Sequence, residues 1–158
     1  MGRGVSEGLL SAEEIAALSG LDYLRAMVAG RIAAPSMAGT LGFRLAEVEQ
    51  GRAVFLGEPS DRVLNPMGIV HGGWALTLID SACGCAGHTT LAPGRAYTTL
   101  ETKTNFVRVI TAESGTVRGE GKIVAAGRTI ITAEARVTDE AGKLLAHGTS
   151  TLLVLSAR

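Results

Sequence analysis

The chain has 158 residues, 46% of them hydrophobic, so it is long enough for one domain with a full core and too short for two. Its 15 Lys and Arg residues balance 15 Asp and Glu residues. This balance excludes the strong positive field expected of a nucleic-acid-binding protein.

Signals for export, membrane insertion and metal binding are missing from the sequence. The first residues show no basic segment followed by an apolar core, and no apolar run approaches the length of a membrane span. The two cysteines, Cys83 and Cys85, point about 200° apart on a helix and cannot pair with each other. We therefore expect a soluble, cytoplasmic protein with no membrane partner and no metal site.

The N-terminal part of the chain predicts helices. Ser11 and Glu14 have the spacing of a capping box and precede an Ala- and Leu-rich segment, which Gly20 is expected to break. A second amphipathic segment covers 21–32 and stops before Pro35. We divide the chain into a helical N-terminal extension, 1–34, whose first residues 1–8 are frayed, and a main domain, 35–158.

The main domain predicts strands around one long helix. Two alternating segments on either side of Gln50-Gly51 indicate a hairpin. Four later segments, rich in Thr, Val and Ile, are joined by short turns such as Thr111-Ala112-Glu113 and predict an antiparallel meander. An apolar segment, 71–90, predicts the helix. The expected strands are 42–49, 52–58, 97–109, 115–124, 129–138 and 144–155.

These elements predict an α+β fold, with a curved antiparallel sheet of about six strands wrapped around the central helix. One apolar helix against one antiparallel sheet covers both hydrophobic faces. Glycine inside a helix costs roughly 0.5–1 kcal/mol against alanine, so its repeated use suggests close approach of the sheet. The small residues that allow this approach are Ser81, Ala82, Gly84, Ala86 and Gly87.

The start of the predicted helix combines two unusual features. His71-Gly72-Gly73 places unpaired backbone N–H groups and a partial positive charge at a flexible point, which suits an anion or a developing oxyanion. Further along the same helix, Asp80 is a lone carboxylate on an apolar surface, which is costly without a partner or a task. We interpret the rest of the chain as a scaffold for this segment.

These residues resemble a known family. Asn65-Pro66-x-Gly68-x-x-His71-Gly72-Gly73, followed by Asp80 and by Thr99-Leu100-Glu101-x-x-x-Asn105-Phe106-x-Arg108, is similar to the hotdog-fold acyl-CoA thioesterases of the phenylacetate-degradation (PaaI-like) type. The resemblance extends from about Ala38 to Leu155. One departure is Val109, where many relatives have proline.

The resemblance implies a hydrolase that converts acyl-CoA thioesters to free acid and CoA, with no cofactor because CoA is part of the substrate. Gly72 would polarise the thioester carbonyl through its amide, assisted by His71. Asp80 would act as general base or nucleophile, and Asn65 and Thr99 would hold the attacking water. It also implies a homodimer with sites at its interface, leaves a homotetramer open, and leaves the acyl group aromatic or medium-chain aliphatic.

Helix geometry supports the dimer independently. Gly72 and Asp80 are eight residues apart and therefore roughly 12 Å apart along the axis, and His71 is roughly 14 Å from Asp80. Asp80 cannot reach a carbonyl held at the start of its own helix. Two antiparallel helices across a twofold axis would place each Asp80 near the other helix start, which gives two sites per dimer.

Three further residues are candidates for substrate binding. Gly73 extends the helix-start site, although both glycines could instead serve tight packing. Arg108, at a strand end, and Arg128, in a turn, could meet CoA phosphates, although ordinary solvated arginines are common at such positions.

Two alternative functions remain open from the sequence. The first is a non-catalytic acyl-CoA-binding module, which could keep the glycines but would not need Asp80. The second is a hotdog enoyl-thioester hydratase, which would want a His–carboxylate pair near a proline-rich entry segment, a pattern that this sequence does not show. Serine-hydrolase chemistry is not supported, because no Gly-x-Ser-x-Gly motif occurs.

Overall fold

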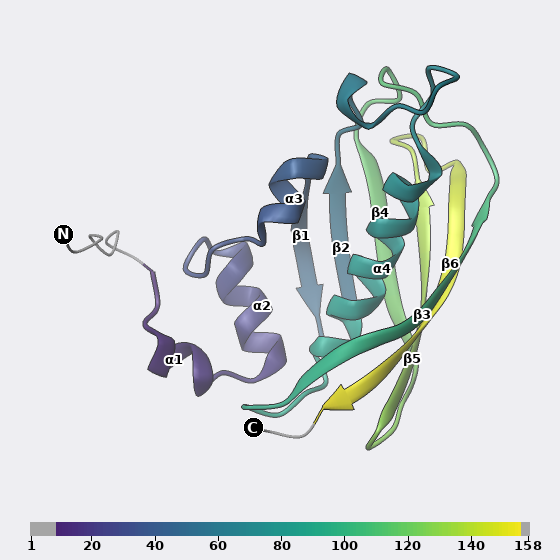
Figure 1. Cartoon of the computed structure of the whole chain (residues 1–158). Coiled ribbons are helices and arrows are strands. Elements are labelled where there is room, and N and C mark those ends of the chain that lie inside the picture. Colours follow the sequence, from purple (N-terminus) through teal and green to yellow (C-terminus); the bar gives the residue numbers. More distant parts are fainter. Residues whose placement is uncertain (1–8, 156–158) are drawn as a thin grey trace.

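The computed structural model describes residues 9–155, so the expectation that 1–8 are frayed lies outside it. The extension forms two helices, α1 (Ala12–Ala16) and α2 (Gly20–Val28). The predicted capping box is present: the Ser11 hydroxyl accepts from the Glu14 N–H, and the Glu14 carboxylate accepts from the Ser11 N–H. Helix α2 packs against the main domain through the buried Leu24 (Figure 1). The boundary at residue 34 stays a prediction.

The first two helices are separated near Gly20, as expected, although the break itself covers 17–19 and Gly20 begins α2 after the cap at Ser19. This glycine is needed there for contact, since a Cβ on Gly20 would lie 1.8 Å from the His88 carbonyl oxygen. An unexpected helix, α3 (Ser36–Leu41), precedes the first strand and ends at Gly42, whose φ of 71° is left-handed.

Six strands form one antiparallel sheet, as predicted. The hairpin is confirmed, because Glu49 pairs with Arg52 across Gln50-Gly51, and Gly51 has a positive φ of 75°. The order across the sheet is β1-β2-β4-β5-β6-β3. The strands are β1 (Phe43–Glu49), β2 (Arg52–Gly57), β3 (Ala96–Phe106), β4 (Val117–Ala126), β5 (Ile130–Thr138) and β6 (Leu144–Leu155).

The predicted meander of the last four strands is wrong for β3. Of these four strands, β4, β5 and β6 follow one another across the sheet in chain order, whereas β3 pairs with β6 at the far edge of the sheet. The segment 107–116 is not a tight turn. It crosses the helix start, where the Ile110 carbonyl accepts from the Val70 N–H and the Ile110 side chain is buried.

Helix α4 (Gly72–His88) lies in the hollow of the curved sheet and contacts all six strands (Figure 1). Its small residues allow close packing as expected: a Cβ on Gly87 would lie 2.3 Å from the Leu152 side chain. This is the hotdog arrangement that the resemblance implies. Within residues 9–155, no helix has both the length and the apolar character needed to cross a membrane.

Candidate active site

The segment before α4 is fixed by its own hydrogen bonds. The Asn65 side-chain oxygen accepts from the N–H groups of Met67 and Ile69, at 2.9 and 3.3 Å. Gly68 completes this turn with a positive φ of 77°. Because the oxygen of Asn65 is used in the turn, its side-chain NH2 group is the part that remains to contact a ligand.

The first turn of α4 leaves one backbone donor free. His71 is the N-cap residue: its Nδ1 accepts from the Gly73 N–H at 2.9 Å, and its carbonyl accepts from the Trp74 N–H at 2.9 Å. The Gly72 N–H has no hydrogen-bond partner among residues 9–155. Since Nδ1 accepts a hydrogen bond, a neutral His71 carries its proton on Nε2, which is a second donor at the helix start.

A cavity of about 340 Å³ opens at this free N–H. Gly72 forms its floor beside the half-exposed ring of Phe106, and a Cβ on Gly72 would lie 2.9 Å from the Phe106 Cζ. Arg108 lies on the wall, where its guanidinium donates to the Leu144 carbonyl. Asn65 and His71 complete the polar part of the lining, so four of the predicted site residues meet around one cavity.

Asp80 lies elsewhere in the chain, eight residues along α4 from Gly72 and therefore about 12 Å from it along the axis. Its side chain is half-buried, and one carboxylate oxygen accepts a hydrogen bond of 2.9 Å from the Thr102 hydroxyl on β3. The structure therefore separates the predicted catalytic residues of one chain into two groups, as the helix spacing predicts.

Thr102 is a residue that the sequence did not reveal. We expected Thr99 to be the strand hydroxyl at the site, yet the hydrogen bond to Asp80 comes from Thr102. A bulge at Leu100 shifts the register between Thr99 and Glu101, so Thr99 opposite Leu152 and Thr102 opposite Ser150 both face α4. Strict alternation would have turned Thr102 outward, and no sequence signal marks the bulge.

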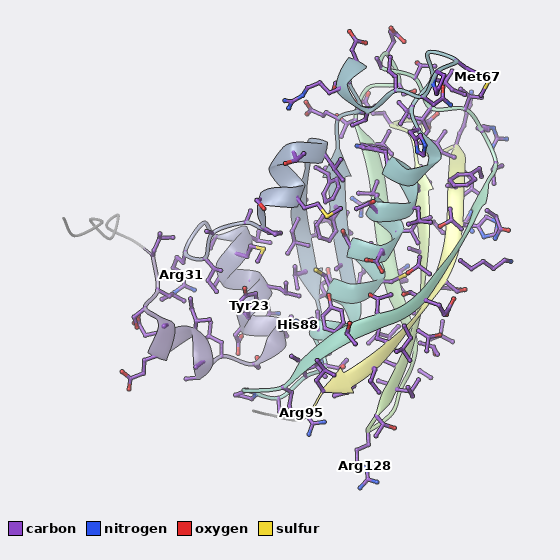
Figure 2. The ribbon with its side chains drawn as sticks, in the orientation of Figure 1. Tyr23, Arg31, Met67, His88, Arg95 and Arg128 are labelled. Carbon is purple, nitrogen blue, oxygen red and sulfur yellow. The ribbon has the colours of Figure 1, made fainter. Side chains whose placement is uncertain are left out.

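The other candidates for substrate binding are placed differently. The N–H of Gly73 already donates to His71, so it is not available to a ligand. The remaining contribution of Gly73 is that it has no side chain to block a ligand. Arg128 lies in the turn between β4 and β5, at the opposite end of the sheet from the loop that carries Met67 and leads into α4 (Figure 2). Within one chain, Arg128 does not meet the cavity at the helix start.

Other titratable groups of α4 are structural. Burial raises the pKa of the Cys83 thiol to about 12, which leaves it a poor nucleophile at neutral pH. Burial lowers the pKa of His88, whose ring stacks on Tyr23 of α2 at 5.4 Å and meets Tyr97 edge-on at 5.6 Å (Figure 2). Within the described chain, no group of three His, Cys, Asp or Glu side chains could hold a metal ion.

Comparison with known proteins relates this geometry to a family. Residues 67–146 match the model of the Thioesterase superfamily. A 1,4-dihydroxy-2-naphthoyl-CoA hydrolase of Listeria monocytogenes serotype 1/2a (strain 10403S) is 28% identical over 119 residues, which cover 75% of this chain and 95% of that protein.

Two solved structures share both fold and sequence with the chain. One is a phenylacetic acid degradation-related protein from Ralstonia eutropha JMP134, with a TM-score of 0.76, 29% identity and coverage of 83% of this chain and 98% of that one. The other is a Streptococcus mutans UA159 protein bound to acetyl CoA, with a TM-score of 0.66, 29% identity and coverage of 74% and 91%. The chain belongs to the thioesterase superfamily and is a thioesterase with the hotdog fold.

Proposed function

We propose that this protein hydrolyses acyl-CoA thioesters to the free acid and CoA. The observation that carries the proposal is the N–H of Gly72, which has no partner in the described chain and belongs to a residue that lines the cavity. A preformed backbone donor at a helix N-terminus suits the oxyanion that develops on a thioester carbonyl. His71 Nε2–H would be the second donor to the same oxygen.

Asp80 supplies the other half of the chemistry in this proposal. As a general base it takes a proton from water while the water oxygen attacks the carbonyl carbon. The C–S bond then breaks, and the thiolate, whose conjugate acid has a pKa near 8.5, leaves without strong acid catalysis. A base is typically worth about 10²–10⁴ in rate and an oxyanion donor about 10²–10³. As a nucleophile, Asp80 would attack the same carbon, the C–S bond would break with release of the thiolate, and water would then hydrolyse the resulting anhydride to the free acid and the Asp80 carboxylate.

The site would be completed by a second protomer, since Asp80 lies about 12 Å along α4 from the Gly72 of its own chain. The residues of α4 that its own sheet leaves uncovered recur at Gly73, Leu76, Thr77 and Asp80, with Leu76 38% exposed. Strand β3 beside them is an open edge that pairs only with β6. A second α4 packed antiparallel on this face would bring its Asp80 to the first cavity.

We further propose an aromatic acyl group as the substrate class. Support comes from the names of two relatives, one a 1,4-dihydroxy-2-naphthoyl-CoA hydrolase and the other a phenylacetic acid degradation-related protein. The acetyl CoA bound to the Streptococcus protein supports recognition of the CoA part. Arg108, and Arg128 from the second protomer, would hold CoA phosphates, while Asn65 and Thr99 would hold the attacking water.

The test is release of free thiol from a panel of aromatic and medium-chain acyl-CoAs by the wild type, Asp80→Asn and the matched control Asp61→Asn. Asp61 is exposed and lies on a short helix outside the cavity. We expect turnover by the wild type and the control, and loss of at least about 10²-fold in Asp80→Asn.

Two results would contradict the proposal. Tight binding of acyl-CoAs with no thiol release by the wild type would indicate the binding module. Addition of water across an enoyl-CoA without thiol release would indicate the hydratase.

A further inference from the structure

Two hydroxyl groups, on the half-buried Thr102 and the buried Ser150, lie in line next to Asp80. The Thr102 hydroxyl lies 2.9 Å from one oxygen of Asp80 and 3.0 Å from the Ser150 hydroxyl on β6. Ser150 in turn donates to the backbone carbonyl of Glu101 at 3.0 Å. Ser150 is 1% exposed and is one of two buried polar residues of the described chain, so this line is built into the interior.

The direction of these hydrogen bonds follows from the charge of Asp80. An ionised carboxylate only accepts, so the single hydroxyl proton of Thr102 points at Asp80. The Thr102 oxygen can then accept only from Ser150. Ser150 has one proton for two acceptors, so it donates either to the Glu101 carbonyl or to Thr102. In both arrangements the carboxylate of Asp80 accepts from Thr102.

The bulge at Leu100 is what turns Thr102 toward the helix. It shifts the pairing of β3 with β6 between Thr99 and Glu101, so that Thr102 faces Ser150 on the inner side of the sheet. Such bulges re-aim side chains next to functional sites. Here the side chain that is re-aimed is the one that holds Asp80.

We propose that Thr102, supported by Ser150, is a positioning residue for Asp80: it fixes one carboxylate oxygen and leaves the other as the oxygen that reacts. The inference rests on the proposed thioesterase role of Asp80. The hydrogen bond restricts rotation of the carboxylate. Thr102 itself does not touch the substrate.

The experiment compares Thr102→Val, Thr102→Ser and Ser150→Ala with the control Thr104→Val, using kcat and KM. Thr104 is the next inward residue of β3, and its buried hydroxyl has no partner in the described chain. Thr104→Val removes a hydroxyl group, as Thr102→Val does, but breaks no hydrogen bond to Asp80. Thermal melting shows whether each variant is folded.

We expect Thr102→Val to lower kcat about tenfold or more with little change in KM, because ground-state binding is intact. Thr102→Ser should restore kcat, and Ser150→Ala should lower kcat by less than Thr102→Val does. Thr104→Val should behave as the wild type.

Unchanged kcat in folded Thr102→Val would overturn the inference, as would an equal loss in Thr104→Val. If Thr102→Val does not fold, unchanged kcat in Ser150→Ala overturns it instead. The parallel Asp80→Asn assay separates the two proposals. Full activity of that variant defeats the proposed function, whereas its inactivity beside an unaffected Thr102→Val defeats only the positioning role.

Discussion

The chemistry of the helix start depends on which N–H groups are already used. His71 satisfies those of Gly73 and Trp74 through its ring and its carbonyl, which leaves the N–H of Gly72, a residue that lines the cavity, without a partner in the described chain. Glycine at this position has no side chain that could block that N–H, and the nearest neighbouring side chain is the ring of Phe106. One backbone group, not a side chain, is therefore the proposed oxyanion donor.

Gly72→Pro tests this donor with little disturbance of the fold. Proline is tolerated at the first helical position, and His71, with ψ of 134°, already has the extended conformation required before proline. Gly72→Ala is the matched control, because it adds a Cβ beside Phe106 but keeps the N–H. We expect kcat of Gly72→Pro to fall about 10²–10³-fold relative to Gly72→Ala. Equal kcat in the two variants would show that the N–H does not contribute.

The positions of residues along a single helix could be predicted from the sequence. Gly72, His71 and Asp80 were placed correctly on one helix, because a helix has a fixed rise and turn. Thr102 was missed, because the face of a strand residue depends on register and the bulge at Leu100 changes it. The roles assigned to Thr99 and Asn65 stay predictions.

At the scale of elements, close contact of helix and sheet fixes where α4 lies. A Cβ on Gly121 of β4 would lie 2.3 Å from the backbone carbonyl oxygen of Ala82, a clash that side-chain movement cannot relieve. Small residues on α4 pointed to such proximity from the sequence. The sequence does not reveal that Gly121 on β4 is the glycine that meets this part of α4, because that depends on how helix and strands pack in the folded chain.

Gly121→Ala should therefore destabilise the protein by more than about 2 kcal/mol, through displacement of α4 from the sheet. Gly39→Ala in α3 is its counterpart, since nothing lies within 4 Å of the added Cβ and alanine favours a helix. That variant should gain roughly 0.5–1 kcal/mol. Chemical denaturation of both checks the pair, and a destabilisation of Gly39→Ala as large as that of Gly121→Ala would contradict the account.

The order of the last four strands was predicted wrongly. Consecutive strands usually pair, so a meander was the natural expectation for the last four strands. The sequence shows that 107–116 connects two strands but not that Ile110 is buried against the helix start. Burial of this connection carries the chain across α4, so β3 is left at the opposite edge from β1.

For the whole molecule, three surfaces could receive a second protomer. The outer face of the sheet carries an ion-pair network in which Arg52 contacts Glu47, Glu49 and Glu120. The hydrogen bond from Arg52 lowers the pKa of Glu120 from 4.5 to about 2, so this face is charged and hydrated at neutral pH. The edge at β1 has α2 beside it (Figure 1). The edge at β3, next to Leu76 and Asp80, has no neighbouring strand on its outer side in residues 9–155 and is the surface that we propose for the second protomer.

We propose that each site combines the helix start of one protomer with Asp80 of another. The most direct test is a heterodimer of one Gly72→Pro protomer and one Asp80→Asn protomer, co-expressed with different tags and purified through both. One of its two sites would be intact and the other would carry both substitutions. The account predicts turnover of about half the wild-type rate per dimer, from two inactive parents. A pure heterodimer no more active than either parent would contradict it.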